Sequence, residues 1–476
     1  MPISTTRRQA MIGAAGMGLA TFGAYRPAFA HKPTKPNIIF ILADDLGYAD
    51  VSCYGRRDYT TPAIDSLAAQ GMLFTQSYAN SAVCSATRTA IITGRYQDRL
   101  PIGLEEPLVN RDVGLPPSHP TLPSKLKDSG YATYLVGKWH LGKLPKYGPL
   151  KSGYGHFWGF RGGALDYFTH DVLGTPDLWD NDSPVETQGY LTDLMGDEAL
   201  RIIDGHSGGD KPFFISLHFN APHWPWEGPD DETEARRLAE MKMGASTIYH
   251  FDGGDLETYG QMVMAMDRQI GRIIAGLERA GLADNTIVIF TSDNGGERFS
   301  DTWPFSGKKT ELLEGGLRIP TIVRWPGYVA QGSSSEQTIM SMDWMPTLLN
   351  AAGADNEDGY WFDGIDLRPA LSGAPPVHRT LCWRYLNMRQ EACRSGDWKY
   401  LKIWGNTFLF NIAKDPLERA NLKDREPDIY ARLVQEYNSW NATMLPLDLE
   451  AFTGGFTGAE IPDNFGVTQT RNVPEE

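Results

Sequence analysis

Residues 37–47 read Asn-Ile-Ile-Phe-Ile-Leu-Ala-Asp-Asp-Leu-Gly. Asn37 is followed by six apolar residues in succession, which is the length of a β-strand with no position left to face water. Strands buried on both faces are typical of parallel sheets covered by helices. Asp44 and Asp45 follow directly. Two carboxylates therefore lie where the strand ends, which is where open α/β sheets bind ligands.

The same buried pattern recurs along the chain and alternates with helical periodicity. Further strands are predicted at Tyr131–Val136, Pro212–Phe219, Thr286–Ser292 and Thr321–Trp325. Helices are predicted at Pro62–Gln70, Thr121–Ser129, Leu256–Ala280 and Met342–Ala351. This alternation predicts an α/β fold, with a large, mainly parallel sheet flanked by helices.

From about residue 377 the pattern changes to short alternating strands. These are predicted at Leu381–Tyr385, Glu391–Arg394, Trp398–Ile403 and Thr407–Asn411, followed by a helix over Pro427–Ala442. We therefore expect a main α/β domain at 36–376, a smaller antiparallel α+β subdomain at 377–445 and an extended tail at 446–476.

The first thirty residues predict an export signal and no part of the fold. Arg7 and Arg8 precede a small-residue apolar run, and Ala28-Phe29-Ala30 supplies a cleavage site. The arginine pair favours twin-arginine export to a bacterial periplasm, with an ordinary secretory signal as the alternative. No cysteine follows Ala30 closely, which argues against a lipid anchor. No other apolar run approaches the roughly 18 residues of a membrane span.

The charge of the chain limits its partners. The 476 residues carry a formal charge of −15, which becomes −18 once the three arginines of the signal are removed. Such an acidic surface disfavours nucleic acid and anionic membranes. An anionic substrate therefore needs a local basic site.

The four cysteines, Cys53, Cys84, Cys382 and Cys393, match no zinc spacing. Cys382 and Cys393 flank a predicted hairpin. They are expected either to pair in an oxidising compartment or to remain two unpaired strand cysteines, and the sequence leaves both open.

A second predicted strand ends, like the first, in a pair of oxygen donors. Asp293 and Asn294 follow the strand at 286–292, as Asp44 and Asp45 follow the first strand. Alone, such a pair is usually a helix cap or a turn. Two pairs at equivalent strand ends are better explained by one shared site for a hard divalent cation.

Basic side chains follow the other predicted strand ends. Lys138 and His140 point the same way in an extended segment, and prolines on both sides stiffen the loop that presents His223. A lone histidine is usually structural, but two on one sheet edge suggest a general acid and base. The loop at 307–320 contains Lys309, which is expected either in a solvated turn or in an oxyanion site.

Residues 84–88, Cys-Ser-Ala-Thr-Arg, begin another predicted helix. A helix N-terminus favours an anion, and Arg88 lies one turn from Cys84 on the same face. The alternative is that Cys84 is a small buried hydrophobe.

Together these segments resemble the type I sulfatases of the alkaline phosphatase superfamily over nearly the whole mature chain. The Cys-x-[Pro/Ala]-x-Arg element followed by Thr-Gly-Arg is highly specific for that family, and Ala86 stands here where proline is commoner. Residues 410–422 also resemble the end-domain motif of the family.

The resemblance implies that a separate maturation enzyme converts Cys84 to Cα-formylglycine, whose hydrate attacks the sulfur of a sulfate ester. The implied ligands of one Ca²⁺ per chain are Asp44, Asp45, Asp293, Asn294 and the modified Cys84. Arg88 and Lys138 would hold the hydrate, with His140 as the partner base, and His223 and Lys309 would face the sulfate.

Two alternatives remain open from the sequence. A phosphonate or phosphate ester hydrolase uses the same scaffold, because sulfate and phosphate are similar tetrahedral anions. A catalytically inactive carbohydrate-binding relative would use exposed tryptophans, for which the candidates are Trp224, Trp226, Trp303 and Trp361. Loops at 166–180 and 251–257 are expected to set the substrate specificity.

Overall fold

The structure is a computed structural model that describes residues 35–107, 112–172, 174–241, 250, 252–354 and 359–447. The predicted export signal, and the predicted tail beyond residue 447, lie outside these ranges. Within them, no helix combines the length and the apolar character needed to cross a bilayer.

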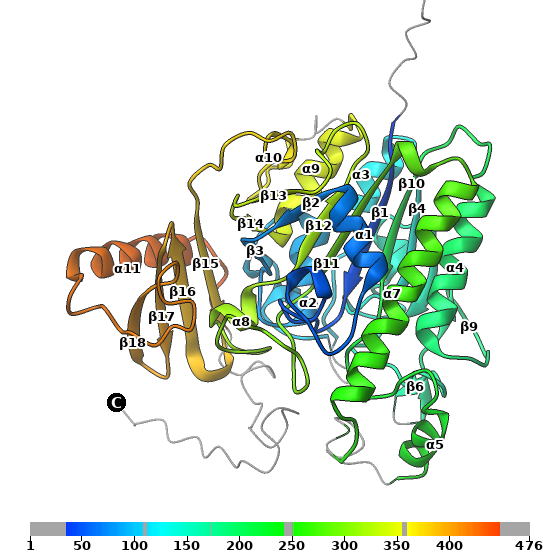
Figure 1. The fold of residues 1–476 in the computed structure, drawn as a ribbon, viewed down its shortest axis with the longest axis horizontal. Coiled ribbons are helices and arrows are strands. Elements are labelled where there is room, and N and C mark those ends of the chain that lie inside the picture. The colour runs from blue at the N-terminus through cyan, green and yellow to red at the C-terminus, as the bar shows by residue number, and fades with distance from the viewer. Residues whose placement is uncertain are drawn as a thin grey trace, which may run out of the picture. The chain divides into compact units, whose positions relative to one another are not determined.

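A ten-stranded sheet organises the described part of the chain (Figure 1). In spatial order its strands are β13 (Ser333–Ser335), β2 (Met72–Phe74), β12 (Thr321–Arg324), β11 (Thr286–Ser292), β1 (Asn37–Ala43), β10 (Phe213–His218), β4 (Ala132–Lys138), β5 (His156–Phe160), β8 (Trp179–Asp180) and β9 (Ser183–Pro184). The central strands from β11 to β5 run parallel, and antiparallel pairs occur towards both edges. The predicted α/β fold class is confirmed.

Helices cover both faces of this sheet (Figure 1). One face packs against α1 (Pro62–Gln70), α4 (Leu191–Gly205) and α7 (Leu256–Arg279), and the other against α2 (Cys84–Thr93), α3 (Leu122–Asp128) and α9 (Trp344–Ala351). Shorter or peripheral helices are α5 (Glu232–Glu240), α8 (Glu314–Leu317) and α10 (Arg368–Leu371). Residues 38–43 of strand β1 are all apolar because helices cover both faces of the sheet there. Ile39 and Ile41 pack into the first helical layer, whereas Ile38 and Phe40 pack into the second.

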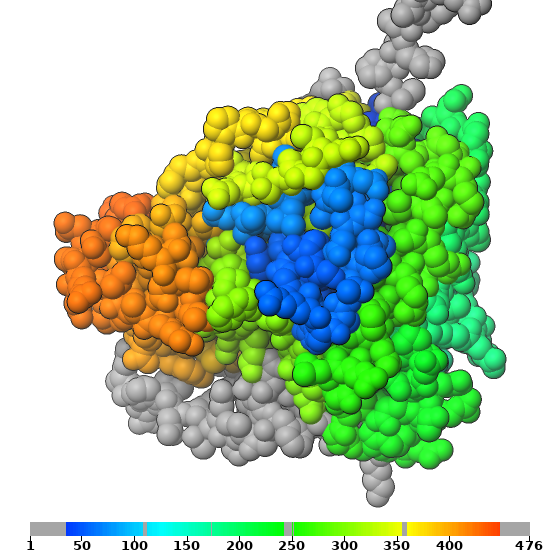
Figure 2. Space-filling model, in the orientation of Figure 1, coloured from blue at the N-terminus to red at the C-terminus, as the bar shows by residue number. Residues whose placement is uncertain are grey.

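A four-stranded antiparallel sheet follows near the C-terminus, as predicted. Its strands are β15 (Thr380–Tyr385), β16 (Gln390–Ser395), β17 (Trp398–Ile403) and β18 (Asn406–Asn411), in that order. Helix α11 (Pro427–Asn441) covers one face, and the other packs against α2 and the segment before α8. In Figure 2 these orange residues adjoin the yellow-green segment. The small sheet thus packs beside Cys84, at the start of α2.

Two smaller pairings complete the strands of the described residues. They join β3 (Ser77–Tyr78) to β14 (Ile339–Met340) and β6 (Asp171–Val172) to β7 (Thr175–Pro176). Cys382 and Cys393 face each other in the β15–β16 register, with their Sγ atoms 2.9 Å apart, and both are free thiols in the structure.

Candidate active site

The loops that follow the parallel strands bring the predicted side chains together at one sheet edge. They are Asp44 and Asp45 after β1, Asp293 and Asn294 after β11, Lys138 and His140 at the end of β4, and His223 after β10. Hydrogen bonds join the first two pairs. The Asp45 amide donates to Asp293 Oδ1 at 3.2 Å, and Asn294 Nδ2 donates to Asp45 Oδ1 at 2.7 Å. The common edge follows from the parallel strands, whose carboxyl ends all point the same way.

Cys84 is the first residue of α2, and its side chain points at this edge. It is 3% exposed, and its Sγ lies 3.3 Å from His140 Nδ1. Burial raises the pKa of the Cys84 thiol above its ordinary range, although Lys138 opposes the shift. The side chain is therefore a neutral thiol at physiological pH, which is a weak nucleophile.

Three buried cations pair with three buried carboxylates around Cys84. The pairs are Lys138 Nζ with Asp44 Oδ2 at 2.6 Å, Lys309 Nζ with Asp45 Oδ2 at 2.6 Å, and Arg88 Nη2 with Asp293 Oδ2 at 2.9 Å. Burial is the largest influence and opposes the charge on Lys138, yet Asp44, Cys84 and Asp293 together outweigh it and raise the pKa of the lysine. A fourth carboxylate, Glu297, is also buried and lies 3.3 Å from Lys309 Nζ, so the ion pairs join three cations to four carboxylates. A bound divalent cation would leave these groups with one net positive charge, which would attract an anion.

Two histidines lie against this cluster. Burial disfavours the charged form of each, whereas Asp45 favours the protonated form of His223. Burial, followed by Lys138 and Arg88, lowers the pKa of His140 well below its usual value. His140 can therefore accept a proton next to Cys84. His223 Nε2 lies 3.4 Å from Asp45 Oδ2, and burial likewise lowers the pKa of His223 well below its usual value.

Three residues of the site adopt left-handed backbone angles that non-glycine residues rarely adopt. The φ values are 61° at Asp45, 54° at His140 and 72° at Thr310, which follows Lys309. This backbone conformation costs free energy in a non-glycine residue. It is found mostly at functional sites, where the surrounding structure holds it in place. Here such turns present Asp45, His140 and Lys309 at the same edge of the sheet.

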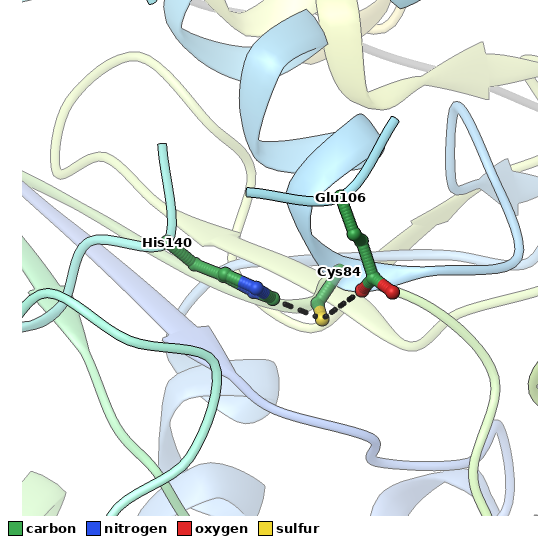
Figure 3. Close-up of side chains that lie close together, drawn as sticks. All are labelled: Cys84, Glu106 and His140. Atoms are coloured by element: carbon green, nitrogen blue, oxygen red, sulfur yellow. Dashed lines mark hydrogen bonds between the residues drawn. The ribbon is translucent and has the colours of Figure 1, made fainter. Parts of the chain in front are cut away.

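The structure adds Glu106, which no sequence pattern identifies. Its Oε1 lies 3.8 Å from Cys84 Sγ, and in Figure 3 Glu106 and His140 approach the sulfur from two sides. Glu106 belongs to an irregular segment after a short 3-10 turn at Pro101–Gly103, so no periodicity indicates its direction. His218, the last residue of β10, also lies here, and its Nδ1 is 3.4 Å from Arg88 Nη1. Because His218 lies at the end of a predicted strand, the sequence alone could have indicated it as a residue of the site.

The four tryptophans proposed for sugar stacking have different environments. Trp226 is buried in the core, and the Trp224 ring packs on His223 at a centroid distance of 4.2 Å. Trp361 lies over Arg95 near the far end of α2, away from Cys84. Trp303 is 66% exposed. It is the best placed of the four to meet a ligand in solution.

A buried thiol among cations and oxygen donors at a sheet edge is the arrangement of a hydrolase that acts on anionic esters. The family described as Sulfatase matches residues 36–354, and the chain belongs to this family. It is thus a sulfuric ester hydrolase. A second family, described as N-sulphoglucosamine sulphohydrolase, C-terminal, matches residues 305–441, which include the four-stranded sheet.

Curated relatives and solved structures agree with this family. The chain is 31% identical to N-acetylgalactosamine-6-sulfatase of Mus musculus, over 94% of this chain and 92% of the relative. It is 29% identical to Arylsulfatase J of Mus musculus, over 87% and 77% of the two chains. The crystal structure of Ps i-CgsB, at 30% identity, superposes with a TM-score of 0.79 over 88% of this chain and 96% of that one. A phosphonate monoester hydrolase of Agrobacterium radiobacter, at 22% identity and a TM-score of 0.59, shares the fold.

Proposed function

We propose that this chain hydrolyses sulfate esters through a formylglycine made from Cys84. The observation that carries the proposal is the position of Cys84 Sγ, buried at the start of α2 between His140 and the paired charges. The thiol itself is a poor nucleophile there, because burial raises its pKa. A side chain that serves as the precursor of another group has no need of thiolate character.

The residues present fit one bound calcium ion. Asp44 Oδ1 and Asn294 Oδ1 are buried and accept no hydrogen bond among the described residues, and both are oxygen donors. We propose Asp44, Asp45, Asp293, Asn294 and the modified Cys84 as its ligands. Oxygen ligands of this kind suit Ca²⁺ better than zinc. When bound, the ion would polarise the nucleophile and neutralise a sulfate oxygen.

The remaining side chains have roles that follow from charge and position. The hydrated aldehyde would supply two hydroxyls, one to attack sulfur and one whose deprotonation releases sulfate. Arg88 and Lys138 hold these oxygens, and His140 Nδ1 accepts the proton at the point that Sγ now occupies. Lys309 faces the sulfate, and His223 protonates the departing oxygen.

The test is the mass of the Cys84 peptide from active enzyme. Conversion of the thiol to the aldehyde lowers it by about 18 Da, and Cys84→Ala should abolish sulfate release from 4-nitrophenyl sulfate. Cys53→Ala is the matched control, because Cys53 is a free thiol outside the site. An unmodified thiol in active enzyme contradicts the proposal. Faster turnover of 4-nitrophenyl phosphate would favour the phosphate ester hydrolase instead.

We further propose that the natural substrate is a sulfated carbohydrate. One relative is named for N-acetylgalactosamine 6-sulfate, and a structure of Ps i-CgsB contains k-i-k-neocarrahexaose. The exposed Trp303 offers an aromatic face of the kind on which sugar rings stack. Ion chromatography of sulfate released from carrageenan oligosaccharides and from N-acetylgalactosamine 6-sulfate tests the class. Turnover of aryl sulfates alone would contradict it.

We also propose that residues 1–30 direct the folded protein to a bacterial periplasm and that maturation of Cys84 by a separate enzyme accompanies this route. The arginine pair at Arg7 and Arg8 carries the proposal. Replacing both by lysine should retain the protein in the cytoplasm, as fractionation would show. Normal export of that variant points to the ordinary secretory route.

A further inference from the structure

We propose that Glu106 and Tyr385 form a subsite beside Cys84 that binds hydroxyl groups on the alcohol part of the substrate and disfavours a second anionic group. The inference rests on the proposed function, because it takes Cys84 as the point where the sulfate is cleaved. Neither residue belongs to the charge cluster described above.

Glu106 reaches the reacting position from outside that cluster. Its carboxylate lies 3.8 Å from Cys84 Sγ, on a different side from His140 (Figure 3). No ion pair joins it to another described residue at 4.0 Å or less. Its side chain is partly buried. An acceptor for hydrogen bonds is thus held next to the scissile position and is still within reach of a ligand.

Tyr385 supplies the second polar atom, from the other sheet. It is the last residue of β15 and is 7% exposed. Its hydroxyl has no hydrogen-bond partner among the described residues. Buried hydroxyl groups are nearly always bonded, so the Tyr385 hydroxyl is available to bond a ligand group or a water next to the site. Burial raises the pKa of Tyr385, with the Glu106 carboxylate as the next cause, which places the two groups in one electrostatic environment.

One pocket connects the two residues to the start of α2. Its lining includes Ser85, Ala86, Glu106 and Tyr385. Arg384, also in this lining, is already bonded to Asp98 at 2.8 Å. The pocket therefore lacks a free arginine to receive an additional anion. It offers instead a carboxylate acceptor and a phenol that can donate or accept.

These groups suit a neutral polyol. A sugar hydroxyl next to the sulfated carbon can donate a hydrogen bond to Glu106 and form another with the Tyr385 hydroxyl. Both side chains would then have a hydrogen-bond partner. A second sulfate or a carboxylate at that point would instead face the Glu106 carboxylate and would be repelled. The subsite thus selects sugars by what surrounds the sulfate ester rather than by the ester itself.

The experiment compares kcat/KM for two substrates on each enzyme preparation. The probes are 4-nitrophenyl sulfate, which lacks sugar hydroxyls, and the faster of galactose 6-sulfate and N-acetylgalactosamine 6-sulfate. Because both probes meet the same preparation, the fraction of converted Cys84 cancels in their ratio. Tyr385→Phe should lower the sugar-to-aryl ratio about tenfold or more, since a site built to bond a hydroxyl loses a partner. Tyr400→Phe is the matched control, because its hydroxyl bonds to Glu391 elsewhere on the same sheet.

Glu106→Gln tests the charge separately. It should narrow the preference for N-acetylgalactosamine 6-sulfate over the corresponding 4,6-disulfate about tenfold, because the repulsive carboxylate is gone. The inference is wrong if Tyr385→Phe lowers kcat/KM equally for the sugar and the aryl sulfate. It is also wrong if Glu106→Gln leaves the preference for the monosulfate over the disulfate unchanged. A wild-type enzyme that cleaves the aryl sulfate and neither sugar would overturn it as well. Those outcomes leave the sulfatase activity intact. An unmodified Cys84 in active enzyme refutes the proposed function instead.

Discussion

Lys399→Met gives a test of how burial controls the charges that support the site. Lys399 Nζ lies 3.0 Å from Glu314 Oε1 and 2.9 Å from Glu418 Oε1, and the side chains of Lys399 and Glu314 are fully buried. Glu314 is also paired with Arg318 at 2.8 Å. Without Lys399, the one donor left to Glu418 among the described residues is the Glu314 amide, at 2.6 Å. Glu418 is therefore the group that loses compensation.

The loss of unfolding free energy depends on whether Glu418 can take up a proton. Breaking a buried pair usually costs about 3 to 5 kcal/mol. Burial already raises the pKa of Glu418 to about 7, and removal of Lys399 raises it further, so the carboxyl takes up a proton at neutral pH. That proton uptake limits the loss to about 3 kcal/mol, the lower end of the range. A carboxyl whose pKa is raised in the folded state stabilises the protein while it is protonated, and this stability is lost as pH rises through the folded pKa. The difference in unfolding free energy between Lys399→Met and the wild type should therefore grow above pH 7.

Urea unfolding at several pH values, followed by tryptophan fluorescence, measures the effect. The matched control is Lys402→Met on the same strand. Its partner Glu391 lies at the same 3.0 Å, but the two side chains are 33% and 27% exposed. An exposed pair contributes about 0.5 kcal/mol. The prediction is wrong if the two variants lose similar stability, or if the deficit of Lys399→Met shrinks as pH rises.

Four further predictions concern the site and the fold. His223→Gln should lower kcat about a hundredfold or more for sulfate esters of alcohols and much less for 4-nitrophenyl sulfate, whose leaving group needs no proton; equal losses would rule out a general acid. Gly163→Ala places a Cβ 2.8 Å from the His140 ring and should lower kcat about tenfold, whereas Gly205→Ala meets nothing within 4 Å and should not. Dialysis against a calcium chelator should abolish activity and lower the thermal unfolding midpoint, and added Ca²⁺ should restore both; full activity in chelator would contradict the metal site. Burial raises the pKa of Asp267 to about 6, so stability from its protonated form is lost as pH rises from about 4 to 6, and Asp267→Asn should flatten that part of the urea-derived profile.

Most of the site could be predicted because strand-end positions are decided locally. An apolar run such as residues 38–43 is buried in a sheet wherever it lies, and parallel strands bring their carboxyl ends to one edge. Their positions at strand ends were enough to predict that four side chains lie together: Asp44, Asp293, Lys138 and His140. The elements that the pattern does not reveal are less regular, as in β5, where Gly159 interrupts a strand of five residues.

Pairing within the site depended on the fold. Local sequence indicates that Lys309 lies in a basic loop, but its contact with Asp45 at 2.6 Å joins residues 264 positions apart. Such contacts depend on how the loop after β11 returns to the edge, and no periodicity encodes that path. The same is true of the left-handed backbone at His140, which the surrounding structure must hold.

Local sequence was enough to predict the α/β fold class, the strand-end donors and the helix that begins at Cys84, because hydrophobic periodicity and helix starts depend on neighbouring residues. The residues opposite Cys84 could not be predicted in this way. Glu106 comes from a segment without periodicity, and Tyr385 comes from a separate sheet whose apolar face packs against α2. Their approach depends on the packing of distant surfaces, which one short stretch of residues does not specify.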